Sequence, residues 1–149
     1  MKKIILTIAI VLGVTQFAQA QTDLGAGVLL GGYNSIGIEA KANFGVTDQI
    51  SISPSFDYFL VDSAYDWTMF MISVDGHYNF EVGESFVAYP LIGLNYLNIS
   101  GDGYSWGTGI GLNIGGGATY GLSDSMKLYA EAKYMRTGFG LSAGLLFSL

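Results

Sequence analysis

The chain has 149 residues, and its six Lys and Arg face twelve Asp and Glu, which gives a formal net charge of −6. A chain this acidic lacks the basic surface that displaces counterions from phosphate groups, so we expect no nucleic-acid partner. It has no Cys, which excludes disulfides, thiolate metal sites and a lipid-modified Cys. Half of the residues are hydrophobic and only 12% are charged, whereas about a quarter of the residues of a soluble domain are charged.

The N-terminal segment has the three parts of a secretory signal peptide. Met1-Lys2-Lys3 is a basic start, residues 4–14 are mostly apolar, and Ala18-Gln19-Ala20 is a small-x-small exit. This pattern predicts a cleaved signal peptide over residues 1–20 and one mature domain over residues 21–149. The apolar run is too short to cross a bilayer as a helix, which takes about 20 residues, and no later run is long enough.

Beyond this segment, apolar residues alternate with small or polar residues in eight runs. A period of two is the pattern of a β-strand with one apolar face, and no stretch has the 3.6-residue period of an amphipathic helix. Pro54 lacks an N–H group and would ordinarily confine its strand to the edge of a sheet. Residues 100–108 form the longest predicted loop. The predicted strands cover residues 24–30, 36–44, 50–60, 69–80, 86–99, 109–120, 128–135 and 142–149.

Three of the predicted turns share the pattern aromatic-x-apolar-x-acidic, at residues 44–48, 80–84 and 120–124. A Tyr follows each turn near the far end of the next strand. The alternation puts these aromatic residues on the apolar faces, in two rings. Such girdles on either side of an apolar band, on strands of roughly ten residues, are typical of transmembrane β-barrels. One ring contains Phe44, Phe80 and Tyr120, and the other contains Tyr58, Tyr96 and Tyr134.

A secreted soluble barrel would alternate in the same way, with its apolar face turned inward around a ligand. The polar faces of the strands argue against this alternative, because they are rich in Gly and Ser and carry few charges, which makes a weakly soluble exterior. As a barrel interior these small residues leave room for the charged ones. The sequence therefore predicts an all-β, eight-stranded antiparallel up-and-down barrel that crosses a membrane with its apolar face in lipid.

The last predicted strand carries a further pattern. Ser142, Gly144, Phe147 and Leu149 resemble the closing-strand signal of bacterial outer-membrane β-barrel proteins, with Leu where Phe is commonest at the terminal position. Over residues 21–149 the chain resembles the small OmpA/OmpX-type barrels of Gram-negative bacteria. The resemblance implies a place in the outer-membrane lipid, recognition of the last strand by the barrel-insertion machinery, and pairing of that strand with the first. An exported chain starts in the periplasm, so we expect the three acidic turns, which lie at the same end of the barrel as the N-terminus, to face the periplasm.

Charged residues also fall on the inward faces of the strands. An eight-stranded barrel is only wide enough for its own side chains, so we expect these residues to fill the lumen, with Lys41 and Lys133 each contacting a carboxylate. We expect His77 to be a hydrogen-bonded interior residue beside Asp75 and Asn79. The lumen charge cluster contains Glu39, Lys41, Asp57, Asp75, His77, Glu131 and Lys133.

The sequence favours a monomeric, non-enzymatic barrel with a filled lumen and a role in envelope integrity or surface interaction. A small ion or solute channel is the alternative. A lipid-modifying enzyme is less favoured, because it needs a His with a Ser and an acidic partner at the membrane face. No catalytic, metal or cofactor site is expected, and the sequence names no external ligand. The candidate contact residues, which alternatively extend the outer aromatic belt, are Tyr65, Trp67, Tyr104, Trp106 and Phe139.

Overall fold

The computed structural model describes residues 21–31, 35–61, 66–105 and 107–149. The predicted signal peptide lies outside these residues. Within them, no helix is long and apolar enough to cross a membrane. The regular elements are strands: β1 (Thr22–Gly31), β2 (Ser35–Gly45), β3 (Ile50–Leu60), β4 (Trp67–Tyr78), β5 (Phe80–Glu81), β6 (Phe86–Gly101), β7 (Tyr104–Ser105), β8 (Gly109–Gly121), β9 (Met126–Met135) and β10 (Gly138–Ser148).

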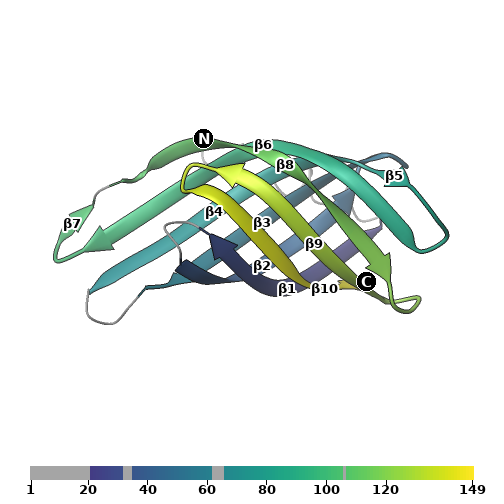
Figure 1. The fold of residues 1–149 in the computed structure, drawn as a ribbon, viewed down its shortest axis with the longest axis horizontal. Helices are drawn as coiled ribbons and strands as arrows, with labels where there is room; N and C mark the ends of the chain where they lie inside the picture. The colour runs from purple at the N-terminus through teal and green to yellow at the C-terminus, as the bar shows by residue number, and fades with distance from the viewer. Residues whose placement is uncertain (1–20, 32–34, 62–65, 106) are drawn as a thin grey trace, which may run out of the picture.

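The eight long strands form one closed antiparallel barrel (Figure 1). Each pairs with its neighbours along the chain, and β1 pairs with β10 from Asp23↔Ser148 to Gly31↔Gly140. This last pairing removes both free edges of the sheet, whose backbone N–H and C=O groups could find no hydrogen-bond partner in lipid. The predicted fold is therefore confirmed. We call the end with residues 46–49, 82–85 and 122–125 the turn end, and the opposite end, which carries β7, the loop end.

The two short strands are local features of the long ones. β5 continues β4 in the same register against β6, and the pairing between them lapses opposite Pro90, which has no N–H to donate. β7 folds back on the end of β6 around Asp102 and Gly103, whose φ angles of 49° and 76° suit the tight two-residue hairpin turn. Part of the predicted loop 100–108 is therefore a short hairpin.

Pro54 lies inside the sheet, in β3 between β2 and β4, and not at an edge as proline ordinarily requires. The β2–β3 ladder lacks two pairs at this point, between Lys41↔Ser55 and Phe44↔Ile52. Ser53 compensates for the missing N–H, because its Oγ donates a hydrogen bond of 3.0 Å to the carbonyl of Ala42. A neighbouring hydroxyl thus lets an interior strand accommodate proline.

The two faces of the wall differ as the alternation predicts. In β3, odd-numbered Ser and Asp residues are buried in the lumen, while Phe56 and Tyr58 are exposed on the outer face. The outer surface is apolar across every long strand, with residues such as Ile92 and Leu112 about two-thirds exposed, at 65% and 68%. Of the two predicted aromatic rings, Tyr58, Phe80, Tyr96, Tyr120 and Tyr134 point outward, and Phe44 is half-buried.

Candidate functional site: the occluded lumen

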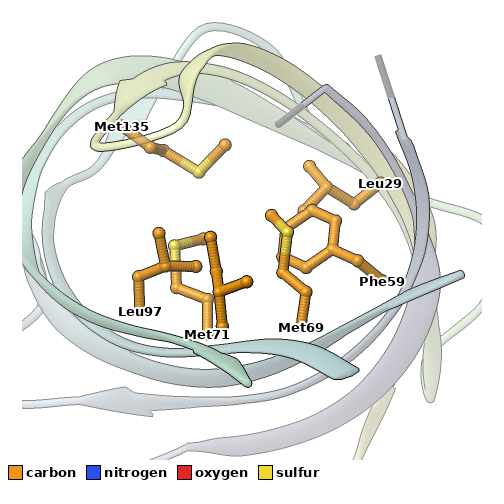
Figure 2. Close-up of a cluster of buried hydrophobic side chains, with 7 residues drawn as sticks. Leu29, Phe59, Met69, Met71, Leu97 and Met135 are labelled. Atoms are coloured by element: carbon orange, nitrogen blue, oxygen red, sulfur yellow. The ribbon is translucent and has the colours of Figure 1, made fainter. Parts of the chain in front are cut away.

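An apolar layer fills the lumen toward the loop end. Figure 2 shows its side chains converging from opposite walls of the barrel. Met71 and Leu97 are fully buried, and Val61 and Trp67 pack against the layer from the loop end. A layer of apolar side chains across a lumen disfavours water and ions, because it offers them no hydrogen bonds. The apolar layer consists of Leu29, Phe59, Met69, Met71, Leu97, Ile99 and Met135.

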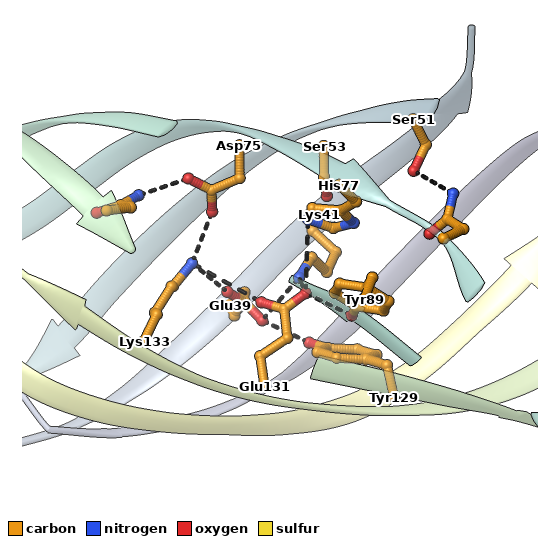
Figure 3. A network of polar contacts seen from close by, with 12 residues as sticks. Glu39, Lys41, Ser51, Ser53, Asp75, His77, Tyr89, Tyr129, Glu131 and Lys133 are labelled. Atoms are coloured by element: carbon orange, nitrogen blue, oxygen red, sulfur yellow. Dashed lines mark hydrogen bonds and ion pairs between the residues drawn. The ribbon is translucent and has the colours of Figure 1, made fainter. Parts of the chain in front are cut away.

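Next to it, toward the turn end, lies a polar layer. All seven residues of the sequence-predicted charge cluster are buried in it, and Figure 3 shows most of them. They come from β2, β3, β4 and β9, so the layer joins strands on opposite sides of the lumen. The polar layer consists of Glu39, Lys41, Asp57, Asp75, His77, Tyr89, Asn95, Asn113, Tyr129, Glu131 and Lys133.

Glu131 is the centre of one half of the polar layer. Its Oε1 accepts hydrogen bonds from Lys41 Nζ at 2.5 Å and from the Tyr89 hydroxyl at 2.8 Å. Lys41 also lies over the ring of Tyr129, with Nζ 4.6 Å from the ring centroid. The Tyr129 hydroxyl donates to Glu39 Oε1 at 2.7 Å. Charge-assisted bonds of this length are the strong class, and here they link β2, β6 and β9 across the lumen.

Lys133 is the centre of the other half. It is 1% exposed, and its Nζ lies 3.1 Å from Asp75 Oδ2, 3.8 Å from Glu131 Oε2 and 4.0 Å from Glu39 Oε2. Asp75 Oδ1 accepts a hydrogen bond from Asn113 at 2.7 Å. Asn113 in turn accepts one from Asn95 at 2.5 Å. One ammonium group therefore faces three carboxylates from three strands, and an amide chain extends the network to β6 and β8.

His77 lies at the boundary of the polar layer on its turn-end side. Its imidazole stacks on the ring of Tyr89, with centroids 4.3 Å apart and planes 9° apart. Its Nε2 is 4.0 Å from Glu131 Oε1, and no described residue hydrogen-bonds to it. The hydrogen bond predicted for His77 is therefore not made at Nε2 among the described residues, and ring stacking helps to position the imidazole.

Asp57 differs from the other carboxylates of the polar layer. It is directly opposite Glu39 in the β2–β3 register, and it forms no ion pair within the described part of the chain. Neither of its oxygens has a hydrogen-bond partner there. Two carboxyl groups facing each other across neighbouring strands are destabilising when both are ionised. The polar layer thus holds four carboxyl groups and two lysines, and Asp57 is the carboxyl group that neither lysine pairs with among the described residues.

Glycines on the inner wall make room for the charged side chains. A Cβ on Gly117 would lie 2.6 Å from Glu131 Cγ and 2.8 Å from Tyr89 Cε2, and a Cβ on Gly115 would lie 2.8 Å from Lys133 Cβ. These distances are shorter than carbon contacts in folded proteins, which are about 3.5–4.0 Å. The Gly-rich inner face of β8 is therefore required by the size of the side chains on the adjacent strands β6 and β9.

The lumen is open at the turn end. A polar cavity of about 800 Å³ extends from the mouth of the barrel to Lys41, His77, Tyr89 and Glu131. Its walls carry small polar residues such as Ser51 and Ser53. The lumen is therefore filled by side chains in its middle and toward the loop end, but not at the turn end.

Several residues of the site are additional to the predicted cluster. Tyr89 is hidden in the sequence because β6 is apolar on both faces. Tyr129 lies at an inward-facing position of a strand whose alternation is clear, so the sequence pattern could have identified it.

Asp23 accepts hydrogen bonds from Lys127 at 2.9 Å and Ser148 at 2.6 Å, which ties β1, β9 and β10 together where the barrel closes. Asp23 and Lys127 lie just beyond the predicted strand ends.

The predicted surface aromatics lie in different places. Trp67 belongs to the lumen and not to the outer surface, because β4 begins at Trp67 and its odd-numbered residues point inward. Phe139 is 61% exposed on the outside of the barrel. The whole of Tyr65 and Trp106 and the side chain of Tyr104 lie outside the described residues.

Comparison with known proteins identifies the class. The family model described as the outer membrane protein beta-barrel domain matches residues 5–144. The chain therefore belongs to this family, whose place is the bacterial outer membrane. No curated protein sequence matches the chain.

Solved structures agree on the fold. The N-terminal β-barrel domain of Pseudomonas aeruginosa OprF has a TM-score of 0.70 at 18% identity, over 88% of this chain and 100% of that chain. A de novo designed transmembrane β-barrel has a TM-score of 0.69 at 16% identity, over 87% and 95%. Ail, the attachment invasion locus protein of Yersinia pestis, has a TM-score of 0.58 at 17% identity, over 87% and 97%.

Proposed function

We propose that this protein is a non-enzymatic structural barrel of the outer membrane whose lumen is closed to solutes, and that it contributes to envelope integrity. The observation that carries the proposal is that two layers of buried side chains fill the lumen, which we interpret as a double closure. The apolar layer excludes water at the loop end, and the polar layer ties opposite walls together beside it. A side-chain-filled interior is what a barrel of this width allows.

The channel alternative is weaker on the same geometry. An ion entering the cavity from the turn end would meet the Lys41–Glu131 pair and then the apolar layer. Passing both requires breaking buried ion pairs and hydrating an apolar constriction, each of which costs several kcal/mol. An enzymatic role is disfavoured because the single His of the chain is buried in the lumen, away from the membrane face.

A deletion strain of the source bacterium tests the envelope role. We expect the deletion to increase sensitivity to detergents, and a plasmid copy of the wild-type gene to restore resistance. Equal detergent sensitivity with and without the gene, together with a loss of adhesion in the deletion strain, would favour the surface-interaction role instead.

We further propose that Ser142, Gly144, Phe147 and Leu149 form the assembly signal of the barrel. Phe147 is opposite Leu24 of β1 and is half exposed on the outer face, and Leu149 N donates to Thr22 O at 2.9 Å. Deleting residues 147–149 should prevent most of the protein from reaching the heat-modifiable folded form in the outer membrane. Asp102→Gly, at the positive-φ position of the β7 hairpin, is the control and should assemble normally. Normal insertion of the truncated chain would contradict the proposal.

A further inference from the structure

The cavity at the turn end has no role in the closure of the lumen. It opens beside the turns that follow β2 and β5, and it ends at the stacked rings of His77 and Tyr89. Figure 3 shows these two side chains. Its volume of about 800 Å³ is in the range of sites that hold small molecules, which is about 300–1,000 Å³. It is a blind pocket lined mainly by polar side chains.

The charges of the cavity favour a cation. Four carboxylates and two lysines line it, and both lysines are already paired, Lys41 with Glu131 and Lys127 with Asp23. The remaining carboxylates, Asp48 and Glu81, lie at the mouth and form no ion pair with a described residue. Gln21, the first residue of the predicted mature chain, also lines the cavity and brings its amino group there, so the lining still holds one more carboxylate than cations and attracts cations over anions.

Two polar atoms in the inner wall of the cavity have no hydrogen-bond partner among the described residues. His77 is 5% exposed, and its Nε2 lies among the cavity residues without a hydrogen-bond partner in the described chain. The side-chain oxygen of Asn43, also in the wall, is a buried acceptor without a donor among the described residues. A buried polar atom without a partner costs free energy, which a ligand with suitable N–H groups recovers.

We propose that this cavity binds a small organic cation that carries primary amines. One ammonium group is held near the carboxylates of Asp48 and Glu81 at the mouth, and N–H groups of the ligand satisfy Asn43 and His77 deeper in the cavity. The ligand enters from the turn end and does not cross the membrane, because the polar layer closes the inner end. The site is thus independent of the envelope role proposed above.

The single His makes the test direct. The protein is folded in nanodiscs of neutral phosphocholine lipid, and the imidazole ¹⁵N signals of His77 are followed by NMR during titration. The probes are putrescine, 1,4-butanediol and succinate, which share a four-carbon chain and differ in charge. We expect a saturable shift of the His77 signals with putrescine and none with the other two. Magnesium chloride serves as a fourth probe and should not reproduce the shift.

Matched variants separate this site from general attraction to the acidic end. Asp48→Asn with Glu81→Gln removes the two carboxylates at the mouth, and should weaken putrescine binding roughly three- to tenfold. Asp124→Asn with Glu84→Gln removes two exposed carboxylates from turns at the same end that do not line the cavity, and should change the Kd by less than about twofold.

The proposal is overturned by an unsaturable or absent shift with putrescine. It is equally overturned if the two double variants weaken binding by the same factor, since the ligand would then be attracted by overall charge. A shift of the same size with magnesium would replace the organic cation by a simple counterion, and a response to butanediol or succinate would remove the charge selectivity on which the proposal depends.

Discussion

The two layers of the lumen fill the same barrel with different chemistry. In the apolar layer, Met71 and Leu97 contact their neighbours through non-directional packing, which flexible side chains achieve in many arrangements. In the polar layer, each of Lys41, Glu131 and Lys133 depends on partners from other strands at defined distances. The difference implies that the apolar layer tolerates changes that preserve volume, whereas the polar layer is sensitive to the loss of one charge.

Lys133→Met should have the largest effect on stability. The change keeps most of the aliphatic side chain but leaves Asp75 without its ammonium partner, and breaking a buried ion pair costs about 3–5 kcal/mol. Denaturant unfolding in lipid vesicles measures it. Met135→Leu, at the next inward position of β9, is the matched control in the apolar layer and should cost less than about 1.5 kcal/mol. Similar losses in the two variants would contradict the difference between the layers.

Gly117→Ala should have an intermediate effect. The added methyl group meets Glu131 and Tyr89 at distances that require the polar layer to shift, and overpacking of this kind costs about 1–3 kcal/mol. Gly76→Ala on the outer face of β4, where the nearest atom is 3.6 Å from the new Cβ, is the control and should leave the unfolding curve nearly unchanged. If both variants unfold like the wild type, the inner face of β8 is not crowded.

Asp57→Asn should have the smallest effect and the opposite sign. It removes a carboxylate that has no ion pair among the described residues and that lies opposite Glu39. We expect the free energy of unfolding to be unchanged or to rise by less than about 1 kcal/mol. Glu131→Gln, which removes the acceptor of Lys41 and Tyr89, is the comparison and should lower it. A large loss in Asp57→Asn would mean that Asp57 has an essential partner.

Much of this arrangement follows from the alternation of the strands. A period of two determines which residues point inward, so the amino-acid pattern alone puts Glu39, Lys133 and the other charged residues on one face of the wall. The pattern does not determine the position of each side chain along the barrel axis, which depends on the register and tilt of the strands. The pairing of Lys133 with Asp75 across the lumen therefore follows only from the three-dimensional fold.

Other features are hidden in the sequence for physical reasons. β6 has apolar residues on both faces, so its alternation is weak and Tyr89 does not stand out. The cavity arises because the inward residues near the turn end, such as Ser51 and Ser53, are too small to reach the opposite wall. Pro54 is a misleading signal, because a serine hydroxyl supplies the hydrogen bond that proline cannot.

Conductance in planar bilayers tests the double closure most directly. Refolded protein, shown to be folded by its heat-dependent mobility on a gel, is inserted alongside a large porin as the positive control. The account predicts no steady open-channel current from the wild type across the voltages at which the porin conducts. Steady unitary currents from the wild-type barrel would show that the apolar and polar layers do not close the lumen.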